Sequence, residues 1–299
     1  MRPTRTPMRP TAKSLILDLL STLRRGAMPV RALIAAGELL GIAGNPMRVA
    51  LARLLAAGLV ERDERGRYRL GARAEAVGTQ IASWRRIDER LRPWSGGWIG
   101  VHTAAVVRGH RRAVKRRSRA LRFLGFRELR PGLLVRPDNL AGGTAKVREQ
   151  LERLGLEPEA PVFALRELDA GLESRARELW DVNALRDEYR SSRRAIEESA
   201  RKLAGELDGL TPARAMTESF LLGGRVIRQI VFDPLLPEPI LPAAERRALV
   251  AAMVDYDRKG RAAWAAFLRS FEVENLRTPA DLRLLDGEEH ALQAAGGAS

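Results

Sequence analysis

The stretch from Gly44 to Leu70 constrains the fold most, because a helix with one apolar face is followed there at once by a charged hairpin. Asn45 is a favourable cap, since its side chain can accept a hydrogen bond from a first-turn amide. Pro46 then occupies a position where no amide is needed. Gly58 is the expected end, because glycine readily adopts the left-handed conformation that closes many helices. The sequence therefore predicts a helix between Asn45 and Gly58.

The apolar residues of this helix recur at the spacing that places them on one face. They are Met47, either Val49 or Ala50, Leu51, Leu54 and Leu55. Arg48 and Arg53 are left on the outer face. We expect this helix to be the recognition helix of a DNA-binding domain.

Two helices are predicted upstream of it. Residues 14–23 carry an apolar stripe made of Leu15, Ile16, Leu19, Leu20 and Leu23. After Gly26, Pro29 suits the first turn of a second helix that ends near Gly37. Its inward residues are Val30, Leu33 and Ile34.

A hairpin follows the third helix. Residues 59–60 enter it, residues 63–67 turn, with Gly66 available for a positive φ, and residues 68–70 return. It carries Arg62, Arg65, Arg67 and Arg69. Three helices and a two-stranded ribbon are typical of the winged helix-turn-helix, whose third helix enters the major groove of DNA. The alternative is a small helical domain whose basic surface is only solvated.

Strands and helices alternate in the middle of the chain. The predicted order is a strand at 98–107, a helix at 108–124, strands at 126–129 and 133–135, a helix around Val147, Leu151 and Leu154, and a strand at 161–165. The order β, α, β, β, α, β is that of the ferredoxin-like fold, an antiparallel sheet with helices on one face.

The predicted helix at 108–124 is strongly basic. Val107, Val114, Leu121 and Leu124 would face inward, and Arg111, Arg112, Lys115, Arg116, Arg119 and Arg122 would fill the other face. Such a face is either a further DNA contact or a solvated surface, and the sequence leaves both open.

Residues 171–299 are predicted to be mostly helical, with helices at 173–207, from Thr211-Pro212 onward, and at 243–271. The proline-rich loop, Asp233 to Pro242, cannot be helical because successive prolines remove donors and force extended backbone. We expect it to brace two helices rather than to contact a ligand. The residues expected in the core are Trp180, Tyr189, Phe220, Trp264 and Phe267. The end from Gly287 is expected to fray.

The net charge of +15 is unevenly distributed. Lys and Arg outnumber Asp and Glu by 17 to 8 in residues 1–90 and by 16 to 8 in residues 91–170, whereas residues 171–299 hold 19 against 21. The first two segments are therefore expected to bind a polyanion. Charge alone would also fit ribosome or membrane binding.

The composition argues against several functional classes. Without cysteine, and with His102, His110 and His290 scattered, neither a disulfide nor a clustered metal site is expected. Paired carboxylates, a nucleophile constellation and a phosphate loop are missing too, so we expect no catalytic residues and no cofactor. The sequence has no apolar run of signal-peptide or membrane-spanning length, which predicts a cytoplasmic protein without a membrane partner.

Six short stretches, in their order and spacing, carry a resemblance that covers nearly the whole chain. They run from Ser14 to Leu19, Arg48 to Leu59, Trp94 to Trp98, Leu124 to Phe126, Arg130 to Pro137 and Asp233 to Pro237. In these stretches the sequence resembles the PaaX family, repressors of phenylacetic acid catabolism.

The resemblance implies an α+β multidomain chain with three parts. These are a winged-helix DNA-binding domain at 1–90, a middle domain at 91–170 similar to CRISPR-associated ferredoxin-like nucleases, and a helical C-terminal domain at 171–299. It also implies a homodimer that binds palindromic operator DNA. Release would follow the binding of an aryl-coenzyme A thioester such as phenylacetyl-coenzyme A.

Carried over by position, the family's recognition-helix arginines fall on Arg48 and Arg53, and its wing falls on residues 62–69. The candidate DNA-binding residues are Asn45, Arg48, Arg53, Arg62, Arg65, Arg67 and Arg69. Arg48, nearer the start of the helix, is expected to read a base and Arg53 to hold a phosphate.

One departure concerns the nuclease-like middle fold, which places a catalytic aspartate just after its first strand. Here residues 98–103 contain none, so metal-assisted cleavage is not expected and His102 should be an ordinary strand residue. An acyl-coenzyme A effector would need an apolar slot and arginines for its phosphates, for which Arg225 and Arg228 are the candidates.

The sequence thus predicts a ligand-released repressor. The alternative is an effector-independent nucleic-acid-binding or architectural protein, which would have little need for a near-neutral helical domain of 129 residues.

Overall fold

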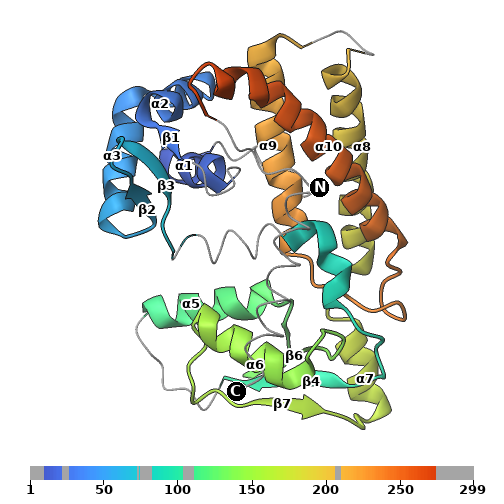
Figure 1. Ribbon diagram of the computed structural model, residues 1–299. Helices are drawn as coiled ribbons and strands as arrows, with labels where there is room; N and C mark the ends of the chain where they lie inside the picture. The colour runs from blue at the N-terminus through green and yellow to red at the C-terminus, as the bar shows by residue number, and fades with distance from the viewer. Residues whose placement is uncertain are drawn as a thin grey trace, which may run out of the picture. The chain divides into compact units, whose positions relative to one another are not determined.

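The computed structural model describes residues 10–21, 27–72, 74, 83–103, 111–205 and 210–273. It is a mixed α+β chain with two small antiparallel sheets, as expected (Figure 1). The chain packs as two units, one from residues 1–82, 198–223 and 255–299 and the other from residues 83–197 and 224–254. Helices α8 (Val182–Leu203), α9 (Pro212–Val231) and α10 (Ala244–Arg269) contribute to both units. A division into three domains stays a prediction.

The first unit begins with the three predicted helices and the predicted hairpin. Its elements are α1 (Ala12–Ser21), β1 (Met28–Pro29), α2 (Val30–Leu39), α3 (Gly44–Ala56), β2 (Val60–Arg62) and β3 (Arg67–Leu70). Strand β3 lies between β2 and β1, with Leu70 opposite Val60 and Tyr68 opposite Met28. Strand β1 was not predicted, because two residues are too few to show a strand pattern.

The core of this unit is shared by residues far apart in the chain. Leu15, Leu33 and Met47 are buried in one cluster with Met216, Trp264, Leu268 and Val273 from the C-terminal helices and the segment after them. The Trp264 indole donates a hydrogen bond to the Met216 carbonyl oxygen at 3.1 Å. Phe220 and Phe267 pack against the same cluster, which confirms the core assignment of these aromatic residues.

The second unit contains the predicted alternation of strands and helices. It comprises β4 (Trp98–His102), α5 (Arg111–Phe123), β5 (Arg127–Arg130), β6 (Leu133–Pro137), α6 (Gly143–Leu154) and β7 (Val162–Leu165). The sheet order is β5-β6-β4-β7, antiparallel throughout. Helices α5 and α6 lie together on one face of this sheet (Figure 1). The expected strand end and helix start at 104–110 fall outside the described residues.

The single helix expected at 173–207 is wrong, because the chain forms two. Helix α7 (Ala170–Arg177) is separated from α8 by a break that contains Trp180. The Asp181 side chain accepts a hydrogen bond from the Ala184 amide at 2.9 Å, which starts a new helix. Trp180 is buried in the break with its ring stacked on Trp98, 6.2 Å between centroids. The apolar spacing continues across the break and hides it from a periodicity analysis.

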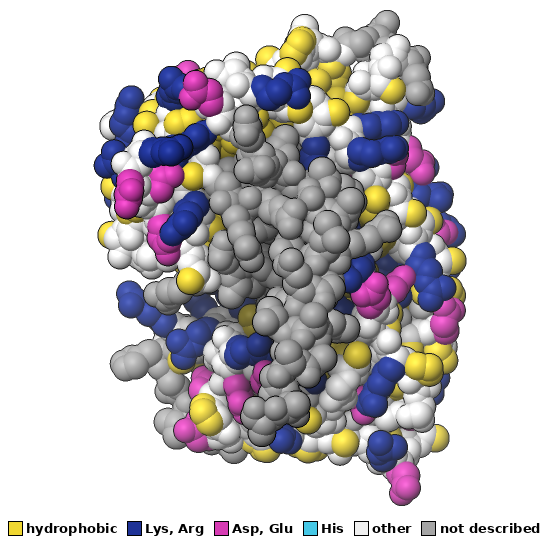
Figure 2. Space-filling view, in the orientation of Figure 1, with side chains coloured by type: hydrophobic (Ala, Val, Ile, Leu, Met, Phe, Trp, Pro, Cys, Tyr) yellow, Lys and Arg dark blue, Asp and Glu magenta, His cyan; other side chains and the backbone are white. Residues whose placement is uncertain are grey.

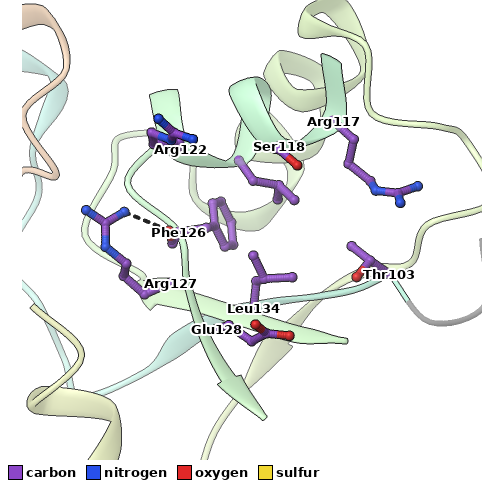
Figure 3. Close-up of a pocket in the computed structure, with 9 residues that line it drawn as sticks. Thr103, Arg117, Ser118, Arg122, Phe126, Arg127, Glu128 and Leu134 are labelled. Carbon is purple, nitrogen blue, oxygen red and sulfur yellow. Dashed lines mark hydrogen bonds between the residues drawn. The ribbon is translucent and has the colours of Figure 1, made fainter. Parts of the chain in front are cut away.

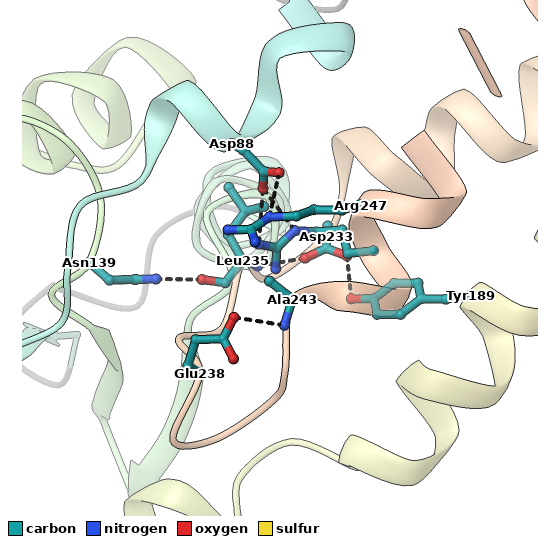
Figure 4. A network of polar contacts seen from close by, with 9 residues as sticks. Asp88, Asn139, Tyr189, Asp233, Leu235, Glu238, Ala243 and Arg247 are labelled. Atoms are coloured by element: carbon teal, nitrogen blue, oxygen red, sulfur yellow. Dashed lines mark hydrogen bonds and ion pairs between the residues drawn. The ribbon is translucent and has the colours of Figure 1, made fainter. Parts of the chain in front are cut away.

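The proline-rich loop is not helical, as predicted, and a buried polar network holds it in place (Figure 4). The Tyr189 hydroxyl on α8 donates to one oxygen of Asp233, whose other oxygen accepts from the Leu235 amide at 2.7 Å. The Leu235 carbonyl accepts from the Asn139 side chain at 2.7 Å, and the Asn139 oxygen accepts from Arg136 on β6 at 3.0 Å. These contacts support the bracing role expected for the loop.

Burial dominates the electrostatics of this network. Loss of hydration raises the pKa of the Asp233 carboxyl and lowers the pKa of the Arg136 guanidinium to about 9. Each group therefore depends on its hydrogen-bond partners, because a buried polar group without a partner is costly.

The substitution Asn139→Ala should lower the free energy of unfolding by roughly 2–4 kcal/mol, because it removes one of the partners of the buried Arg136 guanidinium and the side chain that donates to the Leu235 carbonyl. Urea denaturation measures this loss. The matched control is Asn183→Ala at an exposed position of α8, which should stay within about 0.5 kcal/mol of wild type. Equal effects of the two substitutions would contradict the bracing role.

Candidate nucleic-acid interface

Helix α3 begins before Asn45, so the prediction of Asn45 as its cap is wrong. The cap is Ala43, in extended conformation and without a side-chain bond to the helix. Gly44, Asn45 and Pro46 form the first turn, where amides have no partner within the helix, so proline is tolerated at its third position. The Asn45 side chain is exposed at the helix surface instead.

One face of α3 is buried and the opposite face is exposed. Met47, Leu51 and Leu54 are at most 4% exposed. Ala50 packs against the core and Val49 is 43% exposed, which decides between the two inward candidates. The outer face carries Asn45, Arg48, Val49, Ala52 and Arg53. It therefore combines two guanidinium groups with small or apolar side chains that permit close approach to another surface.

The end of α3 leads the chain directly into the hairpin. Gly58 has a φ of +64° and the Leu59 amide donates to the Leu54 carbonyl at 3.0 Å. This is the glycine-terminated end that the sequence predicted. Helix α3 ends at Ala56 and strand β2 begins at Val60, so only three residues connect the helix to the hairpin and hold the two in a fixed relation.

The turn of the hairpin is organised by one aspartate. The Asp63 side chain accepts hydrogen bonds from the amides of Arg65 and Arg67, at 3.0 and 2.8 Å, and Gly66 has a φ of +73°. Aspartate and glycine at these positions stabilise a tight turn. Arg65 is thereby presented, exposed, at the tip.

The four hairpin arginines are in different environments. Arg69 forms an ion pair with Glu61 across the two strands at 3.0 Å. Arg67 is half-buried and donates to the Glu272 carbonyl at 2.5 Å, which ties the hairpin to the segment after α10. Arg62 lies over the Tyr68 ring, 5.9 Å from its centroid. Arg62 and Arg65 are therefore better placed than Arg67 to meet an external anion.

Sequence reasoning missed the role of Arg67 because its partner lies 205 positions away. It left Val49 and Ala50 as alternatives for one inward position and could not decide between them. Only the packing of α3 against the core shows that Val49 lies between Arg48 and Arg53 on the outer face.

The effector candidates Arg225 and Arg228 are both exposed on α9. A cavity of about 320 Å³ lies elsewhere, between α5 and the sheet (Figure 3). Its lining consists of Thr103, Arg117, Ser118, Leu121, Arg122, Phe126, Arg127, Glu128 and Leu134. Burial and the charge of Arg122 lower the pKa of Arg127.

The described residues contain no group of His, Cys, Asp and Glu that could hold a metal ion. His102 ends strand β4 opposite Leu133, half-buried. The helices of the described part of the chain include none that is both long and apolar enough to cross a membrane.

Met47→Ala should lower the free energy of unfolding by about 2–5 kcal/mol, because it opens a cavity in the shared core. Val49→Ala should change it by no more than about 0.5 kcal/mol, since that side chain is exposed. Chemical denaturation of the two variants tests which face of α3 is turned toward the core. A larger loss for Val49→Ala than for Met47→Ala would contradict the orientation described here.

The sequence and the structure of this chain are similar to those of known proteins. The family model described as PaaX-like protein matches residues 11–74, and that described as PaaX-like protein C-terminal domain matches residues 180–270. The Transcriptional repressor PaaX of Escherichia coli (strain K12) is 30% identical over 234 residues, which span 74% of this chain and 70% of the E. coli protein. The structure of the uncharacterized protein Rv0674 from Mycobacterium tuberculosis is similar with a TM-score of 0.55 and 26% identity, over 86% of this chain and 98% of that one. With these matches at both ends of the chain, the protein belongs to the PaaX-like family.

Proposed function

We propose that this protein is a transcriptional repressor that binds double-stranded operator DNA through α3 and the hairpin. The observation that carries the proposal is the outer face of α3, where Arg48 and Arg53 flank the exposed Val49. Three helices followed by the β2–β3 ribbon correspond to a winged helix-turn-helix. The name of the E. coli relative supports the same function.

The chemistry of this face suits the major groove of DNA. Arginine can form paired hydrogen bonds with guanine, and small apolar side chains contact the methyl group of thymine. We assign base reading to Arg48 and Val49. Arg53 and the hairpin residues Arg62 and Arg65 would contact phosphates, which fixes the position of the protein but carries no sequence information.

The rest of the chain fits a ligand-responsive dimer. The sheet order β5-β6-β4-β7 with both helices on one face agrees with a ferredoxin-like middle domain. In a homodimer two copies of α3 would enter successive major grooves of a palindromic operator. An aryl-coenzyme A thioester, such as phenylacetyl-coenzyme A, would bind the form with lower DNA affinity and so release the operator.

The test uses a duplex that the wild-type protein selects from a random pool. Arg48→Ala should weaken binding to this duplex by roughly 1–3 kcal/mol. It should also relax the base preference at one position of the site, because arginine reads guanine there. Repeated selection with the variant measures that preference. Arg53→Ala is the matched control and should weaken selected and random duplexes alike. Equal weakening on both kinds of duplex by Arg48→Ala would remove its base-reading role.

The complex of the protein with the selected duplex is titrated with phenylacetyl-coenzyme A, other aryl-coenzyme A thioesters and the free aromatic acids. At least one thioester should release the DNA. Fluorescence anisotropy of labelled DNA follows the release. Substitution of Arg225 and Arg228 by Gln should raise the concentration needed if these residues hold the phosphates. Stable complexes with every compound of the panel would favour the effector-independent alternative.

A further inference from the structure

Helix α5 has an unusual charge pattern for a helix of a folded protein. Its 13 residues, RRAVKRRSRALRF, include seven arginines and lysines and no acidic residue. Like charges three or four positions apart on a helix repel each other and destabilise it. Other helices in the chain balance such charges internally: Glu149 on α6 pairs with Lys146 and Arg153 at 2.9 and 3.1 Å, and Glu198 on α8 pairs with Lys202 at 2.9 Å.

Two of the seven cations of α5 have structural partners. Arg117 forms a largely buried ion pair with Glu157 at 3.1 Å, and Arg116 donates to the Gly155 carbonyl at 3.3 Å. The other five are exposed, and no ion pair joins them to any residue that the structure describes: Arg111, Arg112, Lys115, Arg119 and Arg122. Lys and Arg side chains are visible in the space-filling view over the region where Figure 1 places α5 (Figure 2).

The geometry of this face fits a linear polyanion. Arg111, Lys115, Arg119 and Arg122 follow one another at helical spacing and form a single ridge, roughly 17 Å long at 1.5 Å per residue. Phosphates of one DNA strand recur about every 3.4 Å along the duplex, so the ridge can meet several of them.

The apolar side of α5 argues against a membrane surface as the partner. A helix that lies on a membrane inserts its apolar face into the lipid. Here most of that face is already occupied, since Ala120 and Leu121 are buried. Val114, which was expected to face inward, is the exception and is 37% exposed. Little apolar surface is therefore left for insertion, whereas the whole cationic ridge is exposed.

We propose that α5 is a second DNA-binding surface, which holds the phosphate backbone without reading sequence. The choice of DNA as the polyanion rests on the proposed function of α3 and the hairpin. The five exposed cations neutralise phosphates and release counterions, so they contribute affinity on every duplex. The repulsion within α5 is relieved when DNA is bound, which explains why the helix carries no acidic residue.

The test uses the full chain with four substitutions, Arg111→Gln, Arg112→Gln, Lys115→Gln and Arg119→Gln. Affinity for a selected duplex and for a random duplex of the same length is measured at several NaCl concentrations. We expect the slope of log K against log salt to fall by about 0.9 per lost contact, and affinity near 0.1 M salt to fall at least tenfold on both duplexes. The ratio of the two affinities should be unchanged.

The matched control removes the same charge from other exposed positions, through Arg175→Gln, Arg194→Gln, Arg201→Gln and Arg214→Gln. It should leave the slope close to wild type. A further variant with Arg111→Lys, Arg112→Lys and Arg119→Lys keeps the charge and should keep most of the slope. The melting temperature of the Gln variant should equal or exceed that of the wild type, because the variant lacks the repulsion among the cations of α5.

The outcomes separate this inference from the proposed function. If the wild-type protein binds no duplex at all, both fail. If it binds, and the α5 variant has the slope and affinity of the control, α5 is no DNA-binding surface while the function of α3 stands. Loss of binding to anionic vesicles with unchanged DNA binding would likewise overturn the inference.

Discussion

The outer face of α3, which we propose binds DNA, depends on one apolar core that the first seventy residues share with the C-terminal helices. Met47 on α3 is buried in the same cluster as Met216, Trp264 and Leu268. Because close-packed cores tolerate little displacement, this packing fixes the rotation of α3 and so decides that Val49 faces outward. The C-terminal helices therefore act as part of the domain that presents α3. A change in their position would be felt at α3 through direct packing contacts.

Local patterns in the sequence were sufficient for the elements that depend on neighbouring residues. The helices before Gly58, the turn at Gly66 and the non-helical proline-rich loop follow from apolar spacing, glycine conformation and missing donors, and all are present. The features that were missed depend on distant partners. The bond from Arg67 to the Glu272 carbonyl and the entry of Trp264 into the core join segments about two hundred residues apart, and periodicity carries no signal for such contacts.

Charge counting showed which part of the chain is basic. It could not separate the cations that are available for an external anion from those that stabilise the fold. Arg136 is fully buried in the network of the proline-rich loop, and Arg117 is paired with Glu157. Arg136 and Arg117 each add as much to the net charge of their segment as Arg48 or Arg111 does. Neither Arg136 nor Arg117, however, can reach a phosphate. Burial and pairing divide the arginines into those that stabilise the fold and those that remain available for an anion. By this division the exposed arginines of α3, the hairpin tip and α5 are among those that remain available.

Two DNA-binding surfaces of different chemistry would divide affinity from specificity. Contacts to phosphate strengthen binding to every duplex by the same factor, so they leave the preference among sites to the base-reading residues on α3. They also make binding steeply dependent on salt, because each neutralised phosphate releases counterions. For a repressor the fraction of bound operator depends on its affinity relative to the many competing sites on the chromosome. A phosphate-binding α5 would raise total DNA occupancy, and the operator would be favoured only by the margin that Arg48 and Val49 provide.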